Sequence, residues 1–119
     1  MNDTSIPFIA TAFVAVALIL RKFGGTRKMP TQSIIEKIKA GARVVDVRSP
    51  DEFADGAYPK ARNIPLAVLG VRMNELEPKD KPIVLYCASG ARSAQAARIL
   101  KMAGFTDVVN AGGLDDMPQ

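Results

Sequence analysis

The sequence predicts an α/β domain in which helices cover both faces of a central parallel sheet. Short apolar runs at residues 43–47, 83–86 and 107–109 are predicted to be strands, and segments with helical periodicity lie between them. Strands that alternate with helices are joined by crossover connections, which give a parallel sheet buried on both faces. A chain of 119 residues has room for one such domain and a short additional segment.

The additional segment is predicted at the N-terminus, where residues 6–20 are apolar and uncharged. Residues 5–23 approach the length of about 20 residues that crosses a bilayer, and the basic stretch at residues 21–28 follows the apolar run. Positive charge on this side favours an N-terminus outside and a domain in the cytoplasm, whereas a secretory signal peptide carries its positive charge before the apolar run. The alternative is that this run is a buried helix of the fold.

We therefore expect the chain to contain two units. Residues 1–28 are predicted to form one transmembrane helix and a basic linker, anchored through residues 5–23 in a membrane of the bacterial inner (plasma) membrane type. Residues 29–119 are predicted to form the α/β domain on the cytoplasmic side.

The first half of the domain contains two predicted helix starts. Ser33 and Glu36 have the spacing of a capping box and open an amphipathic segment. Ser49 and Glu52 have the same spacing, with a proline at the first helical position. Both positions are therefore predicted to begin helices that flank the strand at residues 43–47.

The second half of the domain contains one loop and two further helices. Residues 56–65 have turn chemistry and are expected to form an ordered loop with a short strand at Asn63–Ile64. Residues 66–76 carry leucine and methionine at helical spacing, which predicts one helix, and another is predicted at Ser93–Ala103. The double glycine at residues 112–113 is expected to end the regular pattern.

The composition excludes several classes of site. The chain has one cysteine and no histidine, which excludes an internal disulfide, a CxxC pair, a Cys–His dyad, a Ser–His–Asp triad and a histidine-bound metal. The net charge is a modest +4 and aromatic residues are sparse, so no nucleic-acid surface is expected. No cofactor and no metal is predicted. Any nucleophile must be activated by backbone dipoles, arginine or lysine.

The single cysteine, Cys87, follows a predicted strand and is therefore expected at the carboxyl edge of the sheet, where such folds bind ligands. Residues 88–91 are small, so their N–H groups can surround an anion, and the helix that follows adds its positive end. Such surroundings lower the pKa of a thiol, and Arg92 adds positive charge. Three interpretations remain open: a buried core cysteine, a phosphatase-type nucleophile and a sulfur carrier.

Several separated motifs connect the domain with a known family. They are VVDVRSPDEFADG at residues 44–56, ARNIP at 61–65, YCASGARS at 86–93, A..L..AGF at 97–105 and GG at 112–113. Their order and content resemble the rhodanese-homology domain of the single-domain bacterial type, and the match runs through most of residues 29–114. The resemblance implies a rhodanese-like three-layer fold and a sulfurtransferase that moves sulfane sulfur from thiosulfate or a persulfide donor to cyanide or a thiol.

The resemblance also implies roles for the residues of the cysteine loop. Cys87 is expected to be the catalytic nucleophile and to carry the sulfur as a persulfide. The small anionic sulfur donor is expected to bind the residues that follow, which are Ala88, Ser89, Gly90, Ala91, Arg92 and Ser93. The Arg92 side chain either binds the sulfonate of thiosulfate or lies along the protein surface, and Ser93 can cap the following helix.

Asp46 and Arg48 match the DVR motif of the family and are expected to support the site. Their role is predicted to be mostly structural, with Arg48 paired to Glu52 and Asp46 fixing the loop backbone. The chain departs from the family pattern at two places. Ala57 stands where many relatives have histidine, and Met117 lies near the position of a usual tryptophan.

Two alternatives to a sulfurtransferase remain. A cysteine phosphatase or arsenate reductase has a Cys-x5-Arg loop, whereas only four residues separate Cys87 from Arg92 here. A non-catalytic, membrane-tethered binding module is the second alternative, and the retained cysteine with its intact loop favours an enzyme over it.

Overall fold

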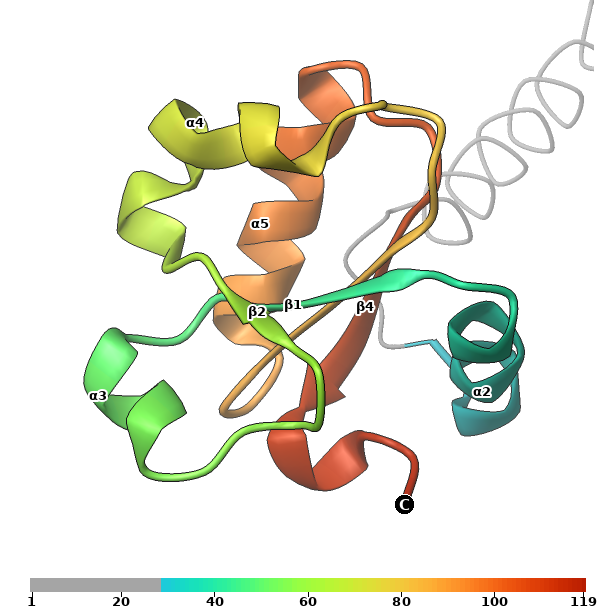
Figure 1. Cartoon of the computed structure of the whole chain (residues 1–119), viewed down its shortest axis with the longest axis vertical. Coiled ribbons are helices and arrows are strands. Elements are labelled where there is room, and N and C mark those ends of the chain that lie inside the picture. Colours follow the sequence, from blue (N-terminus) through green and yellow to red (C-terminus); the bar gives the residue numbers. More distant parts are fainter. Residues whose placement is uncertain (1–28) are drawn as a thin grey trace, which may run out of the picture.

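The computed structural model describes residues 29–119, which form the α/β domain (Figure 1). The predicted transmembrane segment at residues 5–23 lies outside the described residues. No helix within residues 29–119 is long and apolar enough to cross a membrane.

A sheet of four strands runs through the middle of the domain, and all its strand pairs are parallel, as predicted. The strand order is β2-β1-β3-β4, so the strand that ends in the cysteine lies inside the sheet. The strands are β1 (Arg43–Asp46), β2 (Arg62–Asn63), β3 (Ile83–Cys87) and β4 (Val108–Gly113). Because the strands are parallel, their carboxyl ends lie along one edge, where Cys87 pairs in register with Gly113.

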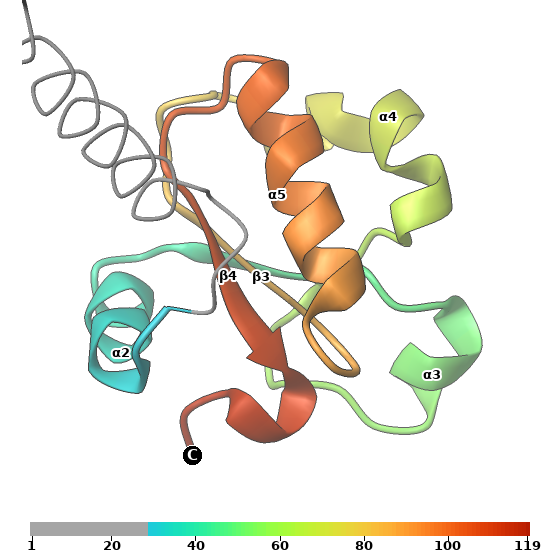
Figure 2. The same ribbon diagram turned by 180° about the vertical axis from the view of Figure 1, so that it is seen from behind.

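Helices cover both faces of this sheet, and Figure 2 shows α2 on the face opposite α5 and α4. The α-helices are α2 (Thr31–Lys39), α3 (Pro50–Ala54), α4 (Leu69–Arg72) and α5 (Ala91–Met102), and the 3-10 turns are η1 (Leu66–Val68), η2 (Met73–Leu76) and η3 (Leu114–Asp116). The predicted α/β class with a central parallel sheet and flanking helices is therefore confirmed.

Strand β3 contributes side chains to two separate cores. Ile83, Leu85 and Cys87 belong to the cluster that includes residues of α5, whereas Val84 and Tyr86 belong to the cluster that includes Ile34 of α2. This division follows from the alternation of side chains along a strand. It directs the Cys87 side chain toward α5, the helix that follows it in the chain.

The capping box predicted at Ser49 is confirmed, and the one predicted at Ser33 is wrong. The Glu52 N–H donates to Ser49 Oγ at 3.2 Å, and the Ser49 N–H donates to Glu52 Oε1 at 3.1 Å. Helix α2 instead begins at Thr31 after Pro30, which makes no side-chain cap. Ser33 therefore lies inside the first turn, where its hydroxyl is not in the capping position.

The single helix predicted for residues 66–76 is replaced by η1, α4 and η2. Leu69 and Leu76 are fully buried here, while Val71 is 82% exposed. Apolar side chains spaced three or four residues apart can face the core in either α or 3-10 geometry, so their spacing does not distinguish the two. Gly70 in the middle of the segment also lowers its helix propensity.

Three other boundaries differ from the predicted ones. Helix α5 begins at Ala91, two residues before Ser93, because Gly90 adopts a left-handed conformation (φ 101°) that turns the chain into the helix. Strand β4 extends to Gly113, beyond the predicted end at residue 109. Strand β2 lies at Arg62–Asn63, one residue earlier than predicted.

Candidate active site

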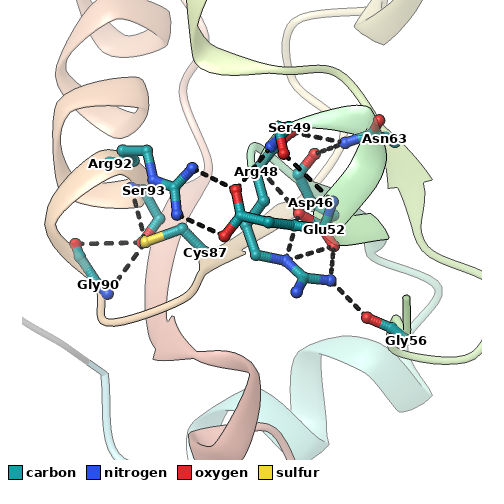
Figure 3. Close-up of polar contacts among 10 residues, drawn as sticks. All are labelled: Asp46, Arg48, Ser49, Glu52, Gly56, Asn63, Cys87, Gly90, Arg92 and Ser93. Atoms are coloured by element: carbon teal, nitrogen blue, oxygen red, sulfur yellow. Dashed lines mark hydrogen bonds and ion pairs between the residues drawn. The ribbon is translucent and has the colours of Figure 1, made fainter. Parts of the chain in front are cut away.

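Cys87 lies at the carboxyl end of β3, and a loop of three residues joins it to the first turn of α5. The whole residue is buried, with 0% of its surface exposed. In the close-up of Figure 3 its sulfur points toward Gly90 and Ser93, on the side of the loop where α5 begins. The position matches the predicted one at the carboxyl edge of a parallel sheet.

Three groups of the loop and of α5 contact the Cys87 sulfur. The Gly90 N–H donates to it at 3.0 Å, the Ser93 N–H donates at 3.4 Å, and the Ser93 hydroxyl lies 3.4 Å away (Figure 3). Burial raises the pKa of Cys87, but the hydrogen bonds from Ser93, Gly90 and the Ser89 backbone outweigh it, so that the pKa lies below the usual value for a thiol. The thiolate is therefore stabilised without histidine, as the sequence requires.

The shape of the loop depends on two glycines. Gly90 has φ 101°, a conformation that L side chains rarely adopt, and it presents its N–H to the sulfur. Gly113 at the end of β4 lies against the loop so closely that a Cβ atom there would collide with the Ala88 carbonyl oxygen. The double glycine that was predicted to end the regular pattern therefore also packs directly against the cysteine loop.

Asn110 of β4 is a part of this region that the sequence analysis missed. Its Oδ1 accepts the Ser93 hydroxyl at 2.6 Å and the Gly112 N–H at 2.9 Å, and its Nδ2 donates to the Gly90 carbonyl at 3.2 Å. It is 3% exposed, and a buried amide must have hydrogen-bond partners. A lone asparagine between apolar residues and the double glycine was the available signal.

The Arg92 guanidinium extends toward Glu52 of α3 and forms an ion pair with it. Its Nη1 and Nη2 donate to the two carboxylate oxygens at 2.8 and 3.0 Å (Figure 3). The hydrogen bonds from Arg92 and from Ser49 lower the pKa of Glu52 to about 2. The side chain is partly exposed and has a partner that the sequence did not indicate, and its role in binding a sulfonate stays a prediction.

The predicted pair between Arg48 and Glu52 is wrong, because Arg48 pairs with Asp46 instead. Arg48 Nε donates to both Asp46 carboxylate oxygens at 3.0 Å, and its Nη2 donates to Asp46 Oδ2 at 2.6 Å and to the Gly56 carbonyl at 2.7 Å. Asp46 Oδ1 also accepts the Arg48 backbone N–H at 2.8 Å, so the expectation that Asp46 fixes the loop backbone is confirmed. Both side chains are buried, and this geometry gives them a structural role.

The predicted loop residues are thus brought together around Cys87, but in different ways. Ser89, Gly90 and Ser93 act on the sulfur, while Ala88 touches Gly113 and Ala91 begins α5. Ser93 does not cap the helix, since α5 has already begun two residues before it. Within residues 29–119, no group of three or more His, Cys, Asp or Glu side chains is placed to hold a metal ion.

The two positions at which the chain departs from the family pattern line the same cavity. It has a volume of about 560 Å³, and its lining includes Ala57, Tyr58 and Met117. Met117 is buried against the α2 side of the sheet, in the same cluster as Tyr86. Both departures therefore lie away from the residues that contact the sulfur.

Three comparisons with known proteins place these observations in context. The Rhodanese-like domain family matches residues 31–117. The chain is 44% identical over 70 residues to a sulfurtransferase of Allochromatium vinosum, in a match covering 59% of this chain and 64% of that protein. It is 39% identical over 74 residues to the thiosulfate sulfurtransferase PspE of Escherichia coli, covering 61% of this chain and 71% of that protein.

Solved structures and a further relative extend this picture. A structure described as a rhodanese with anions from E. coli superposes with a TM-score of 0.62 and 38% identity, covering 66% of this chain and 95% of that one. The protein YqhL of Bacillus subtilis is 44% identical over 81 residues, covering 66% of this chain. The matches span 64% of the length of both YqhL and the A. vinosum protein, so each of these relatives is longer than the shared region.

Proposed function

Because this chain belongs to the rhodanese-like domain family, we propose that it is a sulfurtransferase in which Cys87 carries sulfane sulfur as a persulfide. One observation supports the proposal most strongly. A single buried thiol at the carboxyl end of a parallel strand receives hydrogen bonds from the backbone N–H groups of Gly90 and Ser93. These donors stabilise negative charge on sulfur, which is what both a thiolate and a terminal persulfide require.

In the first step the Cys87 thiolate attacks the outer sulfur of the donor. A new S–S bond forms as the donor's S–S bond breaks, and its electron pair leaves on sulfite when the donor is thiosulfate or on a thiolate when it is an organic persulfide. Cys87 then carries one additional sulfur with one negative charge. The Gly90 and Ser93 amides are placed to hold this charge, since they already donate to the sulfur of Cys87.

In the second step an acceptor attacks the terminal sulfur of the Cys87 persulfide. Cyanide leaves as thiocyanate, and a thiol leaves as a new persulfide, while the electron pair of the broken S–S bond returns to Cys87. The chain contains no other cysteine, so the persulfide cannot be discharged into an internal disulfide. The acceptor is therefore an external small molecule or another protein.

The phosphatase alternative is disfavoured by the loop and by its arginine. Only four residues separate Cys87 from Arg92, which is one fewer than a phosphatase loop contains. The Arg92 guanidinium also donates to Glu52 at 2.8 and 3.0 Å, so these two nitrogens are already occupied by a carboxylate. A small loop with inward N–H groups suits one sulfur atom better than a tetrahedral phosphoryl group.

The proposed location is the cytoplasmic face of a bacterial-type inner membrane, with residues 5–23 as the anchor and the N-terminus outside. The uncharged run at residues 6–20 and the basic stretch after it support this location. Fractionation of cells that express the full chain, with alkaline washing of the membranes, tests it. Release of the protein by the wash would contradict a transmembrane anchor.

Thiocyanate formation from cyanide and a sulfur donor tests the proposed activity. The full chain is assayed in detergent with thiosulfate and with cysteine persulfide, beside Cys87→Ala. We expect the wild-type protein to accelerate transfer from at least one donor and the variant to show only the uncatalysed rate measured without protein, because catalysed transfer requires the thiol. Equal activity in the variant would contradict the role of Cys87, and hydrolysis of an aryl phosphate instead would support a phosphatase.

A further inference from the structure

We propose that Glu52 is a specificity-determining residue, which holds Arg92 and thereby selects organic persulfides against thiosulfate as sulfur donors. This inference rests on the proposed sulfurtransferase function. It concerns the position of the arginine side chain that follows the cysteine loop, five residues after Cys87.

The carboxylate occupies the edge of Arg92 that is formed by its two terminal nitrogens, one of the edges at which an anion can bind. Both oxygens of Glu52 accept hydrogen bonds, at 2.8 Å from Nη1 and 3.0 Å from Nη2 of the guanidinium. This bidentate arrangement is the one by which arginine binds carboxylates, phosphates and similar oxyanions. A sulfonate that sought the same two nitrogens would therefore have to displace Glu52 or bind beside its negative charge.

Glu52 is also held in place from its own helix. Its Oε1 accepts the Ser49 N–H at 3.1 Å, and its backbone N–H donates to the Ser49 hydroxyl at 3.2 Å. The carboxylate thus belongs to the capping box of α3 and is not a freely moving surface group. Because the pKa of Glu52 lies at about 2, the carboxylate stays charged throughout the neutral range and keeps its hold on Arg92.

The second arginine near the loop is neutralised in the same way. Arg48 binds the buried Asp46 at 2.6 Å, so the two arginines and the two carboxylates cancel one another. The charge that remains on these side chains and Cys87 is the negative charge of the thiolate. Thiosulfate carries two negative charges, and two like charges repel each other at the approach to this sulfur. A persulfide group carries at most one.

The surface beside the ion pair suits an organic donor. A cavity of about 470 Å³ is lined by Ser49, Arg92 and mainly apolar side chains, among them Val47, Leu66 and Ile99. The organic part of a persulfide can bury apolar surface there, which is favourable in water. The sulfonate of thiosulfate gains nothing from the apolar side chains of this lining.

Glu52→Gln separates the specificity role from the structural one. Glutamine can still accept the Ser49 N–H, so the capping box is retained. The negative charge that Glu52 places beside Arg92 is lost. Glu75→Gln is the matched control, because Glu75 also pairs with arginines, Arg72 at 2.8 Å and Arg62 at 3.3 Å, and its loss changes the net charge equally.

The experiment measures how fast Cys87 gains one sulfur from each donor. The full chain in detergent is mixed with thiosulfate or with cysteine persulfide. The reaction is quenched by alkylation at different times, and the mass of the protein is measured by mass spectrometry. We expect Glu52→Gln to raise the rate constant for thiosulfate about fivefold, through tighter binding, and to change that for cysteine persulfide less than about twofold. Glu75→Gln should change neither.

The outcomes separate the inference from the function on which it rests. If the wild-type protein gains sulfur but Glu52→Gln leaves the ratio of the two rate constants unchanged, the specificity role is overturned and the sulfurtransferase stands. An equal fall with both donors, together with a lower melting temperature, would assign Glu52 a structural role only and overturn the inference as well. If the wild-type protein gains sulfur from neither donor, the proposed function is overturned and the inference with it.

Discussion

Ser93 contacts the Cys87 sulfur through two of its atoms. Its backbone N–H donates to the sulfur at 3.4 Å, and its hydroxyl oxygen lies 3.4 Å from the same atom. The hydroxyl is held by Asn110, whose Oδ1 accepts it at 2.6 Å. A side chain on the first turn of α5 and an amide on β4 are thereby joined to the thiol at the end of β3.

This contact predicts that Ser93→Ala raises the pKa of Cys87. The hydroxyl is among the groups that lower the pKa against the effect of burial, because it can turn its single proton from Asn110 Oδ1 toward the charged sulfur. A higher pKa leaves less thiolate at neutral pH, so the pH profile of alkylation by iodoacetamide should move to higher pH. Ser89→Ala is the control, because the Ser89 side chain is exposed and its backbone N–H is unchanged by the substitution. Identical profiles for wild type and Ser93→Ala would contradict this prediction.

The close approach of Gly113 to the cysteine loop predicts that Gly113→Ala impairs sulfur transfer. The new Cβ would collide with the Ala88 carbonyl oxygen, and its next neighbours are the Ala88 carbonyl carbon and Ser89 Cα, which are also backbone atoms. The loop must shift, and the donors to Cys87 shift with it. We expect at least a tenfold loss of transfer rate, on the order of 1.4 kcal/mol in the barrier. Gly70→Ala adds the same methyl group where no atom lies within 4 Å and should retain full activity.

The ion pair of Glu52 predicts how acid affects stability. The folded-state pKa of Glu52 is lowered from 4.5 to about 2, so its contribution to the free energy of unfolding is complete above pH 4.5 and is lost as the pH falls toward 2. Glu52→Gln cannot titrate here. Urea unfolding of both proteins should therefore show a wild-type advantage at neutral pH that shrinks between pH 4.5 and about 2. A difference that stays constant over this range would mean that the pair does not stabilise the fold.

The hydroxyl of Tyr86 is predicted to stabilise the loop before β2. It is completely buried and accepts the Tyr58 N–H at 2.9 Å. Burial raises the pKa of Tyr86 to about 12, so the hydroxyl stays neutral over the working pH range. Tyr86→Phe leaves the Tyr58 N–H without this acceptor and should lower the free energy of unfolding by about 1–3 kcal/mol. Tyr58→Phe removes a hydroxyl but keeps that N–H, and a larger loss in this variant would contradict the account.

Much of the fold could be predicted because short apolar runs and helix-capping residues are local signals. The position of β3 between helical segments predicts a strand that is buried on both faces, and its alternating side chains do enter two cores. The Ser49 and Glu52 capping box was also visible because both partners lie within one turn. The division of residues 66–76 into two 3-10 turns and a short α-helix could not be predicted, since buried leucines at this spacing are compatible with either helix geometry.

The site was predictable at Cys87 and less so around it. The small residues after the cysteine indicated a loop of inward N–H groups, and Gly90 and Ser93 provide them. The Glu52–Arg92 pair joins residues 40 positions apart, and no local pattern marks such a partner. Asn110 was missed for a similar reason, because its partners come from the first turn of α5 and from the cysteine loop.

The mass of the full chain after treatment with a sulfur donor tests the central claim most directly. Wild-type protein in detergent is treated separately with thiosulfate and with cysteine persulfide, alkylated and digested. The account predicts one added sulfur atom on the peptide that contains Cys87 and none on Cys87→Ala. Cyanide added before the alkylation should remove this sulfur as thiocyanate. A folded wild-type protein whose Cys87 gains no sulfur from either donor would contradict it.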